Sequence, residues 1–238
     1  MEIIPILCLK DNYAYLLRTP SGATAVVDPS EAEPVLNTLK DRGWKLDFVW
    51  NTHHHFDHVG GNLVLKQKTG CQIIGPKREE RKIPGIDISV SEAEPFRLGE
   101  VEVIAMEVPG HTLGATSYYI PSEKVVFTGD TLFLHGCGRL FEGTAEQMFA
   151  SLAKLAALPS ETQIYCGHEY TLANGKFALS VDGENVVLKR RIEREEDLRK
   201  RGAPTIPGTM GVELETNPFL RAKTAEAFAE LRSRKDVF

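Results

Sequence analysis

The segment Thr52-His53-His54-His55-Phe56-Asp57-His58-Val59-Gly60-Gly61 holds four of the seven histidines of this chain. Side chains two residues apart in an extended segment point the same way. His53 and His55 can therefore place their imidazoles on one metal ion while His54 faces elsewhere. A solvated cluster or a tag-like tract is the alternative, but tags lie at chain ends and do not interleave aspartate and glycine with their histidines.

The second half of this segment predicts a further pair of ligands. If the chain turns at Phe56 into a helix that begins near Gly60, Asp57 and His58 face a second metal position. The two adjacent glycines permit such a turn because they have no Cβ. The segment thus predicts ligands for two metal ions.

Short strands separated by turn signals surround the histidine-rich segment. Residues 2–7, 12–18 and 23–27 predict an antiparallel meander. A helix at 31–42 and an apolar strand at 48–50 then form a β-α-β unit with the histidines at the carboxyl end of its strand. Further strands are expected at 72–74, 101–108, 115–120, 124–128 and 163–166, with a helix at 144–158.

The pattern changes after residue 167. Residues 170–180, 184–201 and 222–234 predict helices with no strand between them. The preceding part holds two strand-rich halves, 1–75 and 95–168, which suit two sheets packed face to face with helices outside. We therefore expect an α/β domain over 1–169 and a helical domain over 170–238.

Three more loops each add one metal ligand, and each directly follows an apolar strand. They carry His111, Asp130 and His168. Because α/β proteins gather their sites at the carboxyl ends of strands, these loops are expected to converge on the HxHxDH segment. Together the ligands number seven, too many for one tetrahedral zinc and suited to two metals that share a carboxylate and a water. His54 and His135 have no place in this count and are expected at the surface or in support of the ligands.

The composition is that of a soluble globular protein of the size of an enzyme. The 238 residues include 42% hydrophobic and 26% charged side chains, which excludes disordered and low-complexity classes. No apolar run approaches the roughly 20 residues that span a bilayer, and residues 1–5 lack the pattern of a signal peptide. We expect a cytoplasmic, monomeric protein with no membrane partner.

The charge and the cysteines exclude further classes. A net charge of −5 argues against a protein that binds the phosphate backbone of nucleic acids. The four cysteines, Cys8, Cys71, Cys137 and Cys166, lie far apart with no CxxC pair, so we expect free thiols.

Six motifs spread over the whole chain resemble one known family. They are THHHFDHVGGN, PGHTLG, FTGDTLF, GCGRLFEGTAEQM, CGHEYTLANGKFA and LRSRKDVF. The chain resembles the hydroxyacylglutathione hydrolases, or glyoxalase II enzymes, within the metallo-β-lactamase superfamily. The resemblance implies a four-layer αββα sandwich with a small C-terminal helical domain that binds glutathione.

The resemblance also implies an activity and a division of the metal ligands. His53, His55 and His111 would hold one divalent ion, Asp57, His58 and His168 the other, and Asp130 would bridge them. Zinc is expected, with iron or manganese as alternatives. A hydroxide that bridges the metals, oriented by Asp57, would attack S-(2-hydroxyacyl)glutathione and release glutathione and D-lactate or a related acid, the second step of methylglyoxal detoxification.

The substrate residues implied by the resemblance are Arg139, Phe141, Tyr170, Arg232 and Lys235. Arg232 and Lys235 lie in a mixed-charge helical turn, where a solvated face is the alternative interpretation. Some relatives have tyrosine where this chain has Phe141, so a phenolic hydrogen bond is absent and only a packing or backbone contact is expected there.

Other functions fit the same superfamily motif. A persulfide dioxygenase would use one iron and consume oxygen. A lactamase or lactonase fits the GCGRLFEGT and LRSRKD segments less well, and a nuclease fits the acidic charge less well. From another class, an idle metal-binding scaffold is disfavoured because structural zinc sites are usually closed by four ligands.

Overall fold

The computed structural model describes residues 1–92 and 94–238, and this part of the chain divides into two compact units. The first unit comprises Met1–Glu107 and Gly114–Glu123, and the second comprises Val108–Leu113 and Lys124–Phe238. His111 therefore belongs to the second unit although its flanking strands belong to the first. Among the described residues, no helix is both long enough and apolar enough to cross a bilayer.

The first unit is built on a six-stranded sheet with the strand order β1 to β6. Its elements are β1 (Glu2–Cys8), β2 (Asn12–Arg18), β3 (Thr24–Val27), α1 (Ala32–Arg42), β4 (Phe48–Trp50), α2 (Phe56–Val59), α3 (Asn62–Thr69), β5 (Gln72–Pro76), the 3-10 turn η1 (Lys77–Glu79) and β6 (Ile88–Val90). Strands β1, β2 and β3 pair antiparallel, whereas β3 to β6 pair parallel. The predicted meander and β-α-β unit are confirmed.

Three antiparallel strands complete the first unit: β7 (Phe96–Leu98), β8 (Val101–Glu107) and β9 (Thr116–Ile120), followed by the 3-10 turn η2 (Pro121–Glu123). Strand β4 is buried on both faces. Val49 packs with Val35 of α1 in one apolar cluster. The next residue, Trp50, meets the rings of Phe96 and Tyr118 at 5.2 and 5.6 Å between centroids, so the two sheets of this unit face each other.

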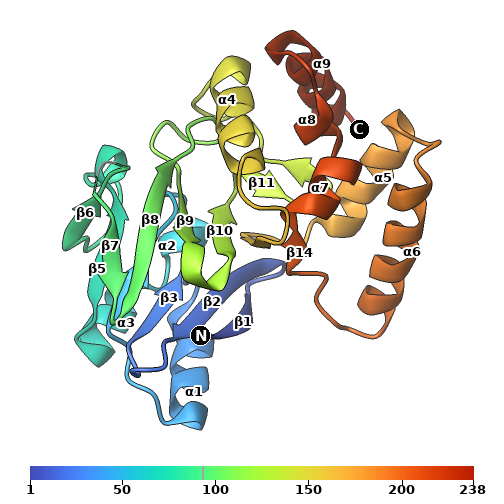
Figure 1. Cartoon of the computed structure of the whole chain (residues 1–238). Coiled ribbons are helices and arrows are strands. Elements are labelled where there is room, and N and C mark those ends of the chain that lie inside the picture. Colours follow the sequence, from blue (N-terminus) through green and yellow to red (C-terminus); the bar gives the residue numbers. More distant parts are fainter. Residues whose placement is uncertain (93) are drawn as a thin grey trace. The chain divides into compact units, whose positions relative to one another are not determined.

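The second unit combines a small sheet with helices, and these helices are coloured yellow to red in Figure 1. Its elements are β10 (Val125–Gly129), β11 (Leu132–Phe133), β12 (Gly136–Cys137), α4 (Ala145–Ala156), β13 (Gln163–Cys166), α5 (Thr171–Val181), α6 (Val186–Lys200), β14 (Gly208–Thr209), α7 (Met210–Thr216), α8 (Pro218–Arg221) and α9 (Ala225–Asp236). Strands β10 and β13 pair parallel, and β11 and β12 form a hairpin. A capping box between Thr144 and Gln147 begins α4.

The helical tail departs from the prediction in two respects, because it contains the short helices α7 and α8 and the short strand β14. We expected no strand between its helices, but the two residues of β14 pair antiparallel with Gln163 and Ile164 of β13. So short a strand has no periodicity of its own to detect, and it forms because β13 offers a partner edge.

A buried ionic network joins the tail to the β11–β12 hairpin. Arg191 pairs with Glu195 at 2.8 Å and with Glu213, and Nε2 of His135 lies 2.6 Å from a Glu195 oxygen. His135 is fully buried, which corrects the expectation of a surface histidine or a support for the ligands. Removing one partner of such a network would leave an uncompensated buried charge.

Candidate metal centre

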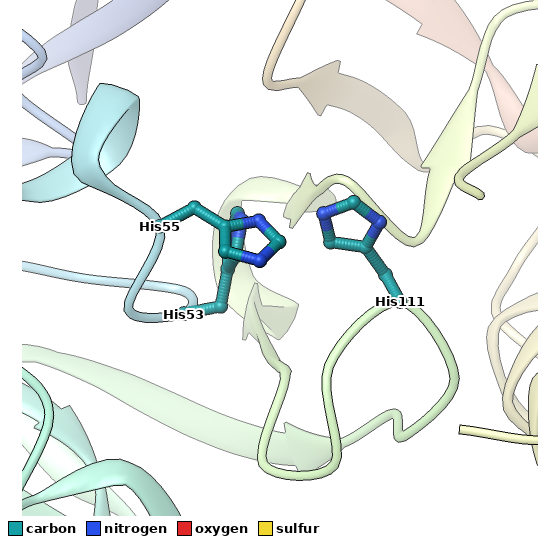
Figure 2. Close-up of side chains that lie close together, drawn as sticks. All are labelled: His53, His55 and His111. Atoms are coloured by element: carbon teal, nitrogen blue, oxygen red, sulfur yellow. The ribbon is translucent and has the colours of Figure 1, made fainter. Parts of the chain in front are cut away.

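His53 and His55 leave the loop between β4 and α2 with their rings next to each other, as Figure 2 shows. Nε2 of His53 lies 3.1 Å from Nδ1 of His55, and the ring planes are inclined at 80°. Two nitrogen ligands of a tetrahedral zinc, at about 2.0–2.1 Å from the metal, lie about 3.3 Å apart. The separation of these two nitrogens therefore fits one shared metal ion.

Helix α2 presents Asp57 and His58. The carboxylate Oδ2 of Asp57 lies 3.6 Å from Nε2 of His58. Nδ2 of Asn12 donates to both the carboxylate and the main-chain carbonyl of Asp57, each at 3.0 Å. Because Asn12, the first residue of β2, holds this carboxylate in place, Asp57 faces His58 in a defined orientation.

The glycines after His58 have a different role from the one we expected. Gly60 and Gly61 have φ of −59° and −81°, in the ordinary helical region, so the turn itself does not need glycine. A Cβ on Gly60 would lie 2.4 Å from the Ser30 carbonyl oxygen, and one on Gly61 would lie 2.7 Å from that of Pro29. The glycines are needed for close packing of the helical segment against the loop after β3.

The Asp28 carboxylate orients two of the candidate ligands, His58 directly and His53 through Thr52. This carboxylate accepts from the Thr52 main-chain N–H at 2.8 Å and the Thr52 hydroxyl at 2.6 Å, and it lies 3.0 Å from Nδ1 of His58. The Thr52 hydroxyl oxygen in turn lies 3.0 Å from Nδ1 of His53. Both rings thus present Nε2 as the ligand atom.

Asp28, which is 2% exposed, was not among the residues predicted from the sequence. The available signal was its position directly after an apolar strand, the same position as Asp130. His54 faces away from this arrangement, with Nδ1 3.0 Å from the buried carboxylate of Glu79, a partner that sequence analysis also missed.

In the second unit, Asp130 meets two histidines. Its Oδ2 lies 3.5 Å from Nε2 of His111 and 3.3 Å from Nε2 of His168. Asp130 and His168 follow β10 and β13, whose parallel pairing brings both carboxyl ends to one edge. Nδ1 of His111 donates to the Arg139 carbonyl at 2.9 Å, which fixes its ring. One carboxylate oxygen within reach of two imidazoles is the arrangement expected of a bridging ligand.

The backbone around this second group is tightly packed. Gly138 approaches Asp130 so closely that a Cβ there would lie 1.9 Å from the Asp130 carbonyl oxygen. Only glycine fits at this position, which gives a physical reason for the glycine in the GCGR motif. The close approach also lets the next carbonyl, that of Arg139, reach His111.

A cleft of about 470 Å³ in the second unit has His111 and Asp130 in its wall. Every residue for which the resemblance implies substrate binding lines the same cleft: Arg139, Phe141, Tyr170, Arg232 and Lys235. The Tyr170 ring stacks on His168 with 4.5 Å between centroids, and Phe141 meets His111 at 5.2 Å. The cleft therefore combines candidate metal-ligand side chains, aromatic rings and cations.

The cations of the cleft differ in exposure. Arg232 is only 4% exposed, donates to the Cys137 carbonyl at 2.9 Å and pairs with Asp236 at 2.9 Å, so the alternative of a solvated face is wrong for this residue. Burial, and then the nearby charges of Arg232 and Arg139, lower the pKa of Lys235. A site that gathers three cations is suited to an anionic ligand.

The four cysteines are free and buried, as expected of reduced thiols. Burial raises the pKa of Cys137 to about 11, and it raises the pKa of Cys166 beyond that of Cys137. A thiol in this state is a poor nucleophile because the thiolate is the reactive form. Neither cysteine is suited to form an acyl-enzyme beside the cleft.

Two family models match consecutive parts of the chain. The model of the metallo-beta-lactamase superfamily matches residues 10–168, and the model of the hydroxyacylglutathione hydrolase C-terminus matches residues 169–238. The compact units divide the chain differently, because the His111 loop and β10 to β13 group with the C-terminal helices.

Relatives of known name cover the whole chain. The hydroxyacylglutathione hydrolase of Methylococcus capsulatus is 51% identical, covering 100% of this chain and 99% of its own length. Among solved structures, ETHE1 from Myxococcus xanthus has a TM-score of 0.76 at 24% identity, covering 98% of this chain and 90% of that one. TTHA1623 in a di-iron-bound form has a TM-score of 0.65 at 25% identity, covering 92% of this chain and 100% of that one.

These likenesses agree with one another. The similar solved structures have the metallo-β-lactamase fold. One of them is the B3 metallo-beta-lactamase BLEG-1, which matches this chain with a TM-score of 0.70. The relatives found by sequence indicate the family within this fold, because their similarity covers both the metallo-β-lactamase part and the C-terminal helices. The chain belongs to the hydroxyacylglutathione hydrolase family of the metallo-β-lactamase superfamily.

Proposed function

We propose that this protein is a metal-dependent thioesterase that hydrolyses S-(2-hydroxyacyl)glutathione, such as S-D-lactoylglutathione. One observation carries the proposal: His111 and Asp130 line the same cleft as Arg139, Arg232 and Lys235. Glutathione carries two carboxylates, which arginine and lysine bind through charge-assisted hydrogen bonds. The relatives named hydroxyacylglutathione hydrolase support the same substrate class.

The chain would hold two divalent metals. His53, His55 and His111 would bind one, Asp57, His58 and His168 the other, and Asp130 would bridge both. The separations of 3.1 to 3.6 Å within each group of donors support this set, as does the di-iron form of TTHA1623. Zinc is proposed, with iron or manganese as alternatives. Bound metals supply a water with a pKa near 7 and polarise the thioester carbonyl.

The protein side chains have distinct roles in this reaction. Asp57, held by Asn12, would accept a hydrogen bond from the attacking water and orient it toward the carbonyl carbon. Tyr170, stacked on His168, and Phe141, beside His111, would form apolar walls that exclude other water. Because Phe141 has no hydroxyl, it contributes packing rather than a hydrogen bond.

Water and the thioester are the only reactants of this hydrolysis. Water adds to the thioester carbonyl and the C–S bond breaks, so the acyl group becomes a carboxylate and glutathione leaves as a thiolate. Of the two protons of the water, one passes to solvent and the other to solvent or to the thiolate. A thiol with a pKa of about 8.5 leaves without strong acid assistance.

The domains would divide this work. Residues 1–169 would carry the metals, and residues 170–238 would bind glutathione through Tyr170, Arg232 and Lys235. The enzyme is proposed to act as a monomer. Four free thiols support a reducing, cytoplasmic setting.

Hydrolysis of S-D-lactoylglutathione by the purified protein tests this function, with released thiol and bound metal measured before and after chelation. The proposal predicts fast release that chelation abolishes, with about two metals per chain. A fully metallated protein that releases no thiol would refute it, and oxygen uptake with glutathione persulfide would then identify a dioxygenase.

A further inference from the structure

Three phenylalanines of the second unit form a continuous row of rings, called the aromatic row below. Phe219 of α8 stacks on Phe177 of α5 with 5.8 Å between centroids and 20° between planes. Phe177 meets Phe238, which follows α9, edge to face at 5.4 Å. The row therefore joins α5 to the end of the chain, where α8 and α9 follow each other closely.

Two cations of α9, Arg232 and Lys235, lie over the aromatic row. The Arg232 guanidinium is 5.2 Å from the centroid of Phe219. Nζ of Lys235 is 5.3 Å from the centroid of Phe177 and 5.6 Å from that of Phe238. These distances are within the range of cation–π attraction, and residues three apart on a helix are neighbours on its surface.

The two cations are held to different degrees. Arg232 is buried and bonded to the Cys137 carbonyl and to Asp236, so its position does not depend on the rings. Lys235 makes one hydrogen bond, to the Ala173 carbonyl at 3.2 Å, and no described carboxylate pairs with it. An ammonium has three donors, so two remain for a ligand in the cleft.

We propose that the aromatic row positions the Lys235 ammonium, and that Phe238 is the member that sets the affinity for a carboxylate of glutathione. This rests on the proposed function. A lysine side chain has a flexible four-carbon stem and loses rotamer entropy when its ammonium binds a ligand. Rings on two sides order the ammonium before the ligand arrives, which reduces that loss.

Phe238 allows this role to be tested separately from folding. It is 65% exposed, whereas Phe177 is 1% exposed and its replacement would disturb the core. Phe238→Leu keeps an apolar side chain but removes the ring. We expect a KM for S-D-lactoylglutathione about fivefold higher and a kcat changed less than about twofold. Phe238→Tyr keeps the ring, and its KM is expected to equal that of the wild-type protein.

Two comparisons exclude other causes. Val237→Ala alters a neighbouring side chain that is 87% exposed, and it is expected to leave the KM unchanged. In a Lys235→Met background, Phe238→Leu should have no further effect on KM, because its effect passes through Lys235. A normal KM for Phe238→Leu, or an equal rise in both backgrounds, would overturn the proposal.

A readout independent of turnover separates this inference from the proposed function. Ring currents should shift the Lys235 ε-methylene protons upfield in the NMR spectrum, and Phe238→Leu should reduce that shift. Ordinary lysine shifts in the wild-type protein would overturn the positioning role even if the enzyme hydrolyses the thioester. Conversely, a wild-type protein that releases no thiol but shows the upfield shift would refute the proposed function alone.

Discussion

Replacing Asp28 by asparagine tests whether an orienting carboxylate is required for metal binding. Asp28 accepts hydrogen bonds from the Thr52 N–H and hydroxyl and lies 3.0 Å from Nδ1 of His58. Asparagine has nearly the same shape but only one acceptor oxygen. If that oxygen keeps the bond from the Thr52 N–H, the NH₂ group faces Nδ1 of His58.

The consequence for His58 follows from its tautomer. An NH₂ donor opposite Nδ1 would favour the ring form that carries its proton on Nε2, the atom that must bind the metal. Each charge-assisted hydrogen bond that is lost costs about 1.5–3 kcal/mol. Loss of a group that orients a metal-bound histidine typically lowers metal affinity 10-fold to 100-fold, which corresponds to about 1.4–2.7 kcal/mol. This range is close to the cost of one lost charge-assisted hydrogen bond. We expect a fall of this size in metal affinity and in kcat/KM.

The assay is metal content after equilibration with a graded series of chelator concentrations, followed by kcat/KM for the thioester. Asp47→Asn is the matched control, because Asp47 also accepts from a main-chain N–H, that of Thr24 at 2.8 Å, but contacts no histidine among the described residues. An Asp28→Asn protein that keeps its metal as tightly as the Asp47→Asn protein would refute this reasoning.

Four other predictions concern the cleft and its surroundings. Asp130→Asn should lower the content of both metals together, measured by elemental analysis, and full retention with full turnover would contradict a bridging role. Lys235→Ala should raise KM about 10-fold to 100-fold with little change in kcat, since a hydrogen bond to a charged group contributes about 1.5–3 kcal/mol. Burial and nearby arginines lower the pKa of Lys235, so its ammonium loses its proton at a pH below the ordinary lysine pKa. The wild-type KM should therefore rise with pH in that range, and Lys235→Arg should remove this rise. Iodoacetamide at about pH 8 should leave the native enzyme active, because burial raises the pKa of Cys137 to about 11; inactivation that tracks alkylation of Cys137 would count against this.

Much of the fold follows from local pattern. Alternating short strands and turn signals predicted β1, β2 and β3, and an amphipathic segment predicted α1, because strand and helix periodicities depend only on neighbouring residues. Elements without such a pattern were missed. The two residues of β14 are one case, and the short helices α7 and α8 are others.

The role of a residue is less predictable than its presence. Gly60 and Gly61 were expected to allow a special turn, but their backbone is ordinary and their small size matters instead. The burial of Arg232 was also hidden in the sequence, because a mixed-charge helical turn is usually solvated. Both properties depend on what packs against the residue, and that partner lies elsewhere in the chain.

By itself, the sequence determined which residue types are available for metal binding, since the HxHxDH spacing places several ligands within one short segment. Tertiary structure alone decided which groups hold the functional side chains in place. Asp28 reaches His58 across 30 residues, and the Cys137 carbonyl reaches Arg232 across 95. Hydrogen bonds and cation–π contacts require particular distances and directions, which arise only when distant segments pack together, so no local pattern of residues encodes them.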